Sequence, residues 1–207
     1  MLKSVVSAVI VSLLLAFPAV SMAGVPTDTV KSTVDKVIQT LKDPSLKGAA
    51  KEKERRAKIR VAVTNVFDFS EMAKRSLGQY WKDRSESERK EFVALFSDLL
   101  ERSYINKIES YSDEKIVYEK ESLEDDYAVV KTRFVTKRRE EIPVDYKLLK
   151  EDGNWGVYDL VIENISLVNN YRIQFNKIIR TSSYQELVRK MKNKSESESF
   201  VSPGKAK

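Results

Sequence analysis

The apolar positions in the first half of the chain recur at helical spacing. Between residues 28 and 42 they predict an amphipathic helix. We predict a second helix from about Ala49, a short helix over residues 70–77, and a long helix over residues 85–111 that opens with a capping box. The apolar stripe of the first helix consists of Val30, Val34, Val37, Ile38 and Leu41.

The pattern changes after residue 114 from helical spacing to short β-branched and aromatic runs. Asp152-Gly153 separates two of these runs, and such a pair is typical of a tight hairpin. Helical spacing returns between Leu167 and Met191. The fold class predicted is therefore α+β, with a four-stranded (or slightly larger) antiparallel sheet between N-terminal and C-terminal helices. The predicted strands are Lys115–Lys120, Tyr127–Thr136, Ile142–Lys150 and Asn154–Glu163.

The composition excludes several kinds of chemistry. The 207 residues include no Cys and no His, which rules out thiol nucleophiles, disulfides, Cys/His zinc sites and Ser-His-Asp triads. The six Gly residues lie too far apart for a phosphate-binding loop. We therefore expect no catalytic residue and no cofactor. We also expect no metal site, because the acidic pair Asp125-Asp126 alone is weak evidence for a bound cation.

The N-terminus has the pattern of a secretory signal peptide. Lys3 precedes an apolar run from Val5 to Phe17, and Ser21 and Ala23 place small residues at a cleavage site. The run is shorter than the roughly 20 residues of a membrane-spanning helix, although an N-terminal anchor is the alternative. We predict a signal peptide over residues 1–23, one domain over 24–192 and a disordered tail over 193–207.

Two segments resemble the MlaC family of toluene-tolerance auxiliary proteins. Residues 157–175 read VYDLVIENISLVNNYRIQF, close to the family pattern V-Y-D-V-V-I-E-G-V-S-L-V-x-N-Y-R-x-x-F. Residues 67–81, FDFSEMAKRSLGQYW, followed by ERKEF at 88–92, match a second run of the family. The similarity covers roughly residues 28–192. Asn164 stands where the family commonly has Gly, and Asn tolerates the left-handed conformation.

The resemblance implies a periplasmic phospholipid carrier and no enzymatic activity. Family members have a cone-shaped fold like that of nuclear transport factor two, with acyl chains in an apolar cavity between sheet and helices. They pass lipid between an outer-membrane lipoprotein complex and an inner-membrane ABC transporter that carries an MCE-domain ring. We therefore expect a monomer with these partners, only peripheral membrane contact and no nucleic-acid partner.

The residues predicted to contact the acyl chains are inward-facing apolar positions of the long helix, the strands and the C-terminal motif. They are Phe96, Leu100, Tyr104, Ile108, Val129, Tyr146, Leu148, Leu160, Ile165, Val168, Tyr171 and Phe175. The strand around Leu160 is apolar on both faces, so its orientation stays open. For the head group we predict Arg172 and Asn169, and a surface ion pair at a helix terminus is the alternative.

Two further readings remain open. Lys137-Arg138-Arg139 is either a solvated turn or a docking site for anionic head groups or an acidic partner. The protein is alternatively an exported enzyme that uses Asp159 and Tyr158 in the same pocket, or an adaptor without a ligand.

Overall fold

The computed structural model describes residues 25–111, 113–197 and Phe200. The predicted signal peptide lies outside the described residues. No helix within the described part of the chain is long and apolar enough to cross a membrane. The helices are α1 (Val25–Lys42), α2 (Glu52–Thr64), α3 (Phe69–Leu77), α4 (Glu86–Glu109), α5 (Leu167–Thr181), α6 (Tyr184–Lys192) and α7 (Lys194–Ser197), with short 3-10 turns at Pro44–Leu46, Ala49–Lys51 and Gly78–Trp81.

Local capping chemistry sets the helix boundaries. The Ser85 hydroxyl accepts the Glu88 N–H at 3.2 Å, and the Glu88 carboxylate accepts the Ser85 N–H at 2.8 Å. This reciprocal pair begins α4 as the sequence predicted. Asp68 caps α3 by accepting the Glu71 N–H at 2.8 Å, and Gly78 ends that helix with a φ of 61°.

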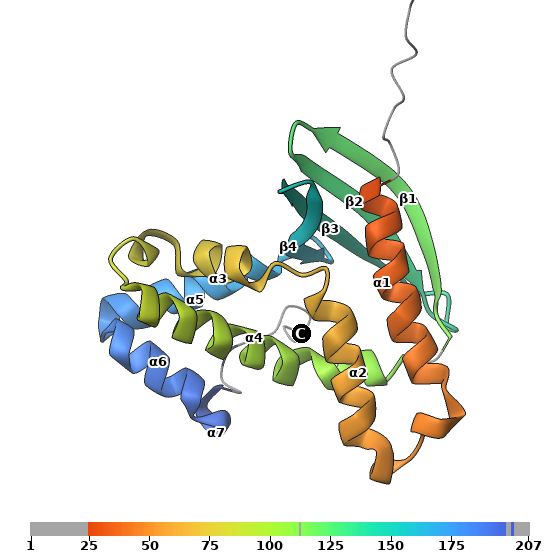
Figure 1. The fold of residues 1–207 in the computed structure, drawn as a ribbon, viewed down its shortest axis with the longest axis horizontal. Coiled ribbons are helices and arrows are strands. Elements are labelled where there is room, and N and C mark those ends of the chain that lie inside the picture. The colour runs from red at the N-terminus through yellow and green to blue at the C-terminus, as the bar shows by residue number, and fades with distance from the viewer. Residues whose placement is uncertain (1–24, 112, 198–199, 201–207) are drawn as a thin grey trace, which may run out of the picture.

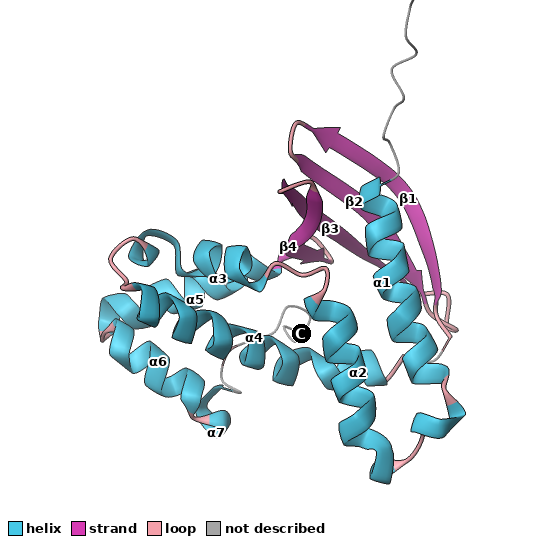
Figure 2. Ribbon diagram, in the orientation of Figure 1, coloured by secondary structure: helices cyan, strands magenta, loops and turns pink. Residues whose placement is uncertain are grey.

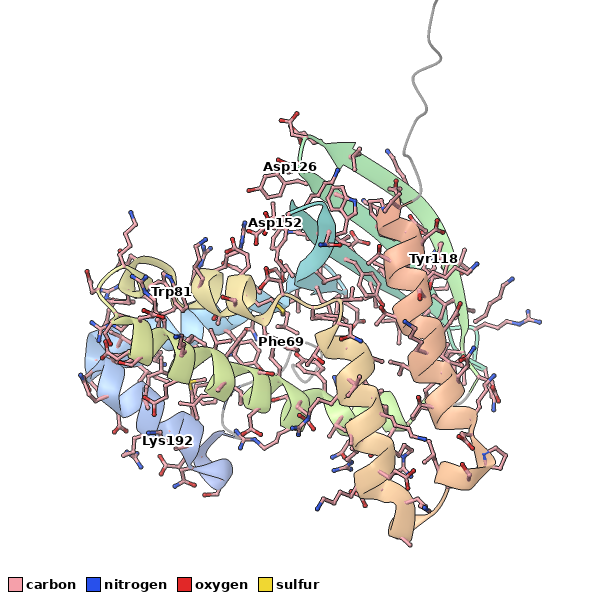
Figure 3. The ribbon with its side chains drawn as sticks, in the orientation of Figure 1. Phe69, Trp81, Tyr118, Asp126, Asp152 and Lys192 are labelled. Carbon is pink, nitrogen blue, oxygen red and sulfur yellow. The ribbon has the colours of Figure 1, made fainter. Side chains whose placement is uncertain are left out.

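The sheet is an antiparallel meander in the order β1-β2-β3-β4-β5. Asp152 and Gly153 both have positive φ in the β3–β4 hairpin, as a two-residue hairpin turn requires. Asp126 and Asp152, in the β1–β2 and β3–β4 turns, lie at one end of the sheet, far from Lys192 of α6 (Figure 3). The strands are β1 (Lys115–Glu124), β2 (Tyr127–Val135), β3 (Glu141–Glu151), β4 (Asn154–Ile162) and β5 (Ile165–Ser166).

The fifth strand is short and was not among the four predicted runs. Glu163 and Asn164 turn the chain with φ of 49° and 65°, and Ser166 then pairs with Val161 of β4. Two residues are too few to show any alternation of apolar and polar positions. Strand and helix content are confirmed as α+β, with helices flanking an open five-stranded antiparallel sheet (Figure 2).

The molecule has two hydrophobic clusters. Helices α3, α4, α5 and α6 form one at the end remote from the strands, and α1 lies across the sheet to form the other (Figure 1). In the helical cluster Phe96 packs edge-on against Tyr171, with ring centroids 5.4 Å apart. In the sheet cluster Val30 of α1 packs with Val130 and Leu148.

The C-terminal tail differs from the predicted disorder over part of its length. Residues Lys194–Ser197 form α7, and Phe200 is only 4% exposed. The Phe200 ring meets Phe175 edge-on with centroids 5.6 Å apart. The polar Ser/Glu run gave no periodic signal, whereas one aromatic side chain is enough to dock this segment on the helical cluster.

Asp159 of β4 joins the sheet to the helical cluster. It is 4% exposed, and its carboxylate accepts the Val168 N–H at 3.0 Å and the Ser166 hydroxyl at 2.7 Å. A negative charge at the start of α5 is also favoured by the helix dipole. The sequence analysis offered Asp159 as a candidate acid or base, and its oxygens bind the first turn of α5.

Replacing Asp159 with Ala is expected to destabilise the fold by about 2 kcal/mol or more, because the buried Val168 N–H loses its acceptor. Urea denaturation of Asp159→Ala against wild type measures this loss. Asp145→Ala, on the neighbouring strand β3, is the matched control and should change the free energy of unfolding by less than about 0.5 kcal/mol. Equal effects of the two substitutions would contradict the assigned role.

Candidate functional site

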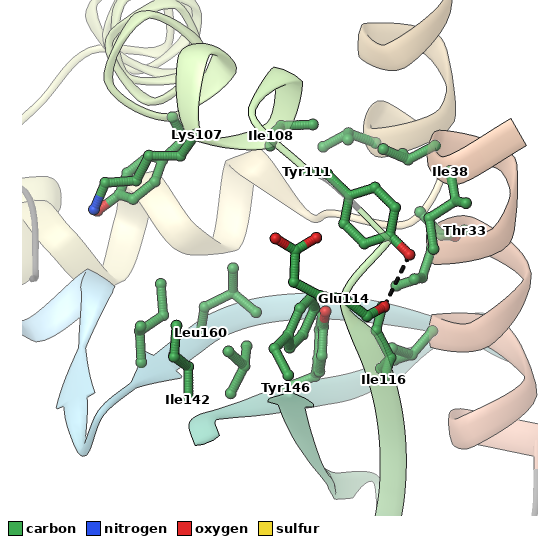
Figure 4. Close-up of a pocket in the computed structure, with 18 of the residues that line it drawn as sticks. Thr33, Ile38, Lys107, Ile108, Tyr111, Glu114, Ile116, Ile142, Tyr146 and Leu160 are labelled. Atoms are coloured by element: carbon green, nitrogen blue, oxygen red, sulfur yellow. Dashed lines mark hydrogen bonds between the residues drawn. The ribbon is translucent and has the colours of Figure 1, made fainter. Parts of the chain in front are cut away.

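An apolar cavity of about 560 Å³ lies between α1, the sheet and the C-terminal end of α4. Figure 4 shows its two sides, with Ile108 and Tyr111 above and Ile142, Tyr146 and Leu160 of the sheet below. The third side is the stripe of α1, formed by Val30, Val34, Val37, Ile38 and Leu41.

A second compartment of about 290 Å³ continues the cavity between α2 and α4. Ile59 of α2, together with Met72 and Leu100, lines only this compartment. The side chains that line both compartments, and so mark where they meet, are Val63, Phe67, Tyr104, Ile108, Phe134, Val144, Tyr146, Leu160 and Ile162.

Several apolar side chains that line this cavity are only half-buried. Val34, Val37 and Ile38 of α1 point toward the sheet but are half-buried, as are Leu160 and Ile162 of β4. Protein interiors are normally packed as densely as organic crystals. Inward aliphatic side chains that the protein covers only in part therefore mark a site for an apolar ligand.

A few polar side chains line the larger compartment. They include Lys107, Glu114, Thr136 and Glu163. The Tyr111 hydroxyl donates to the Glu114 carbonyl at 2.9 Å (Figure 4). A ligand with a long apolar part and a polar end fits this arrangement.

Ion pairs hold α2 beside α4 over the second compartment. Glu109 of α4 contacts Arg55 at 2.6 Å and Arg56 at 2.7 Å, and Arg60 contacts Glu101 at 2.7 Å. Burial by itself would raise the pKa of Glu109, but the hydrogen bonds and charges of Arg56 and Arg55 outweigh it and hold that pKa below its ordinary value. Arg56, Arg60 and Glu101 also line the compartment.

Five of the twelve positions predicted for the acyl chains line the cavity. Leu100 lines the second compartment, whereas Tyr104, Ile108, Tyr146 and Leu160 line both. The orientation of Leu160, which the sequence left open, is thus inward. These five share the space with the stripe of α1.

Four other predicted positions lie in the helical cluster instead. Phe96, Val168, Tyr171 and Phe175 are nearly or fully buried there and line neither compartment. The apolar stripe of α5 faces the aromatic side chains of α4. The side chains of the two helices pack against each other and leave no room for a ligand between them. Helical spacing predicts a buried face and does not say what covers it.

The last three predicted positions lie on the strands, and none of them lines the cavity. Leu148 is fully buried in the sheet cluster, and Val129 points to the opposite face from Ala128 and Val130. Ile165 is 42% exposed on β5. Alternation along a strand fixes which residues share a face, but only the position of α1 decides which face bounds the cavity.

The two residues predicted for the head group lie on the surface of α5. The Arg172 guanidinium donates to the Asn169 amide oxygen at 2.6 Å, and both side chains are exposed. The aliphatic part of Arg172 lies close to Gly78. Neither residue lines the cavity, so their arrangement matches the alternative of a local surface contact.

The cavity-lining residues that the sequence analysis did not propose are those of α1. Its apolar stripe was found by periodicity but was not among the positions predicted for the acyl chains. The available signal was that Val30 to Leu41 forms a second apolar layer in addition to that of the long helix. Nothing local to the sequence states that this helix crosses the sheet.

The remaining polar candidates lie apart from one another. Tyr158 lies at the β-bulge of β4 beside Asp159, with its ring centre 4.1 Å from the Arg75 guanidinium and its ring edge-on to Tyr127, and it lines neither compartment. Lys137, Arg138 and Arg139 form an exposed turn next to Thr136 of the cavity edge. Among the described residues no group of three or more acidic side chains is placed to hold a metal ion.

A family model described as MlaC protein matches residues 31–193. The chain belongs to the MlaC family. The resemblance read from the two sequence motifs is therefore confirmed. In Haemophilus influenzae, the intermembrane phospholipid transport system binding protein MlaC is 26% identical over 120 residues, which is 56% of either chain. The chain thus aligns with about half the length of this curated relative.

A solved structure supports the MlaC fold. It is that of a phospholipid-binding protein from Ralstonia solanacearum in complex with a phospholipid, and it superimposes with a TM-score of 0.74 at 23% identity. The match covers 84% of this chain and 98% of the other. At this identity the likeness shows a shared fold.

Glu109→Gln is expected to lower the melting temperature at neutral pH and to lose this effect in acid. A carboxylate with a lowered folded-state pKa stabilises the protein above its ordinary value of 4.5, and this contribution disappears as pH falls through the folded-state pKa. Melting curves of both proteins from pH 7 to pH 3 should therefore converge. Glu124→Gln, at the exposed end of β1, is the control. A constant difference across the pH range would show that Glu109 does not act through its charge.

Proposed function

We propose that this MlaC-family protein binds a phospholipid, with the acyl chains in the two-compartment cavity, and carries it through the periplasm. The observation that carries the proposal is the cavity itself, whose walls are mainly aliphatic and aromatic, with a few charged side chains in the lining of each compartment. The names of the Haemophilus and Ralstonia relatives, which include phospholipid transport and phospholipid binding, agree with this ligand.

The volume fits a diacyl lipid. A group of the size of a water molecule or a methylene occupies roughly 30 Å³. The larger compartment, of about 560 Å³, then holds on the order of one acyl chain of 16 to 18 carbons. The second, of about 290 Å³, takes a large part of another chain. One phospholipid for each protein molecule is the stoichiometry that follows.

The energetics require a carrier of this kind. Exposing some thirty methylenes to water costs more than about 20 kcal/mol at 0.8 kcal/mol each. The cavity replaces one apolar environment with another, so exchange with a bilayer or a partner is close to neutral and reversible. The net direction of lipid transfer then depends on the partner proteins. We propose that these are an inner-membrane MCE-domain ABC transporter and an outer-membrane lipoprotein complex.

The enzyme alternative has no supporting geometry. Asp159 binds the first turn of α5 through both carboxylate oxygens, Tyr158 packs against Arg75 and Tyr127, and neither side chain lines the cavity. An acid–base pair needs its two groups to meet at one substrate. We therefore assign Asp159 a structural role and the cavity a binding role.

The protein purified from the periplasm without detergent is expected to carry one phospholipid per chain in native mass spectrometry. Ile38→Trp should abolish this, because the indole fills the space between α1 and the sheet. Val61→Trp is the matched control, since Val61 is 60% exposed on α2 and lies outside the cavity lining. Thermal unfolding verifies that both variants fold.

A lipid-free mass for wild type would contradict the proposal and favour the adaptor alternative. Retention of lipid by Ile38→Trp at the wild-type level would place the ligand elsewhere. Extraction of the bound lipid then identifies its head group.

Reversing the basic turn with Lys137→Glu, Arg138→Glu and Arg139→Glu is expected to weaken binding to vesicles that contain phosphatidylglycerol. The turn is exposed beside the cavity edge, so attraction to anionic lipid would bring that edge to the bilayer. Vesicle co-sedimentation at low and high salt measures the effect. Reversal of the exposed Lys82, Lys177 and Arg180 gives the same charge change at the helical end. Unchanged binding of the turn variant would identify it as a solvated loop.

A further inference from the structure

The cavity contains a hydroxyl group that the described part of the protein leaves without a hydrogen bond. Tyr146 of β3 is 7% exposed and lines both compartments. No residue among those the structure describes donates to or accepts from its phenol oxygen, and that oxygen is open to the cavity rather than enclosed by protein. A ligand that fills the cavity covers the oxygen, and a covered polar group without a partner costs about 1–3 kcal/mol. A ligand that itself supplies the partner avoids this cost.

The position of Tyr146 indicates which part of a bound ligand could accept a hydrogen bond from its hydroxyl. It lies on the sheet side of the cavity, across from Ile108 and Tyr111 (Figure 4). Because it lines both compartments, it marks the point from which one chain can enter each of them. In a diacyl phospholipid the two chains diverge at the glycerol, where each is attached through an ester.

The chemistry of the phenol selects an acceptor. Burial raises the pKa of Tyr146, and the nearby Tyr118 raises it further, so the group stays neutral and protonated at physiological pH. A neutral phenol donates one hydrogen bond. The methylenes of an acyl chain offer no acceptor, whereas an ester carbonyl does.

We propose that the Tyr146 hydroxyl donates a hydrogen bond to an ester carbonyl of the bound phospholipid, and that it thereby sets the depth of the acyl chains and favours ester-linked over ether-linked lipids. This inference rests on the proposed phospholipid-binding function. It assigns to Tyr146 a role in specificity, in addition to its contact with the chains.

Tyr118 provides a matched control on the neighbouring part of the sheet. Its hydroxyl is also buried and has no hydrogen-bond partner in the described structure, and burial raises its pKa to about 12. It packs against the sheet cluster but lines neither compartment. A Tyr→Phe change there removes the same atom without reaching the ligand.

The experiment compares wild type, Tyr146→Phe and Tyr118→Phe after removal of lipid. Each protein is offered an equimolar mixture of diester and diether phosphatidylethanolamine with equal chain lengths, and native mass spectrometry gives the ratio bound. One neutral hydrogen bond corresponds to about a threefold to tenfold preference. We expect that preference for the diester in wild type and in Tyr118→Phe, and equal binding in Tyr146→Phe.

Two outcomes overturn the inference while leaving the carrier function in place. They are equal binding of both lipids by wild type, which is the result expected if water serves as the partner, and a diester preference that survives in Tyr146→Phe. Binding of neither lipid by wild type overturns the proposed function and the inference together. Thermal unfolding of the lipid-free proteins tests the fold: Tyr118→Phe should be at least as stable as wild type because it loses an enclosed hydroxyl that lacks a partner, and Tyr146→Phe should stay within about 1 kcal/mol of wild type because its hydroxyl is open to the cavity.

Discussion

The feature on which the rest of the structure depends is incomplete packing between the apolar helices and the apolar face of the sheet. The helical cluster is closed by fully buried aromatic side chains, whereas much of the sheet cluster borders the cavity. The side chains of α1, α2, α4 and the sheet surround a space that the described chain does not fill. A close-packed core leaves no such space. The cavity therefore follows from how the sheet and the helices are joined.

Two kinds of polar contact make that joint. Asp159 connects β4 to the start of α5 and therefore fixes the sheet against the helical cluster. Glu109 and its arginine partners hold α2 beside α4 across the second compartment. The first is buried and rigid, whereas the second is partly exposed and made of long side chains. Ion pairs between partly exposed side chains are worth less than a buried, hydrogen-bonded carboxylate, so the contact between α2 and α4 is the weaker of the two.

An apolar cavity favours apolar ligands in general, because apolar burial is not directional. Selectivity among such ligands needs polar groups at defined positions. Tyr146 inside the cavity and the charged side chains in its lining are the groups that can supply it. Under the proposed function, the same apolar interior would hold lipid against water and exchange it with a membrane, whose interior is equally apolar.

The sequence by itself determined the elements and their order, because their signals are local. The capping box at Ser85, the Asp152-Gly153 hairpin and the change of apolar period each depend on a few neighbouring residues. It also identified the family through two motifs. Only the tertiary structure decided which apolar faces meet: α5 packs on the aromatic side chains of α4, which places Tyr171 and Phe175 in the helical cluster, and α1 packs on the sheet, which places its stripe along the cavity. The physical reason is that hydrophobic periodicity shows that a face is buried, whereas the identity of its neighbour is set by contacts between residues distant in the sequence.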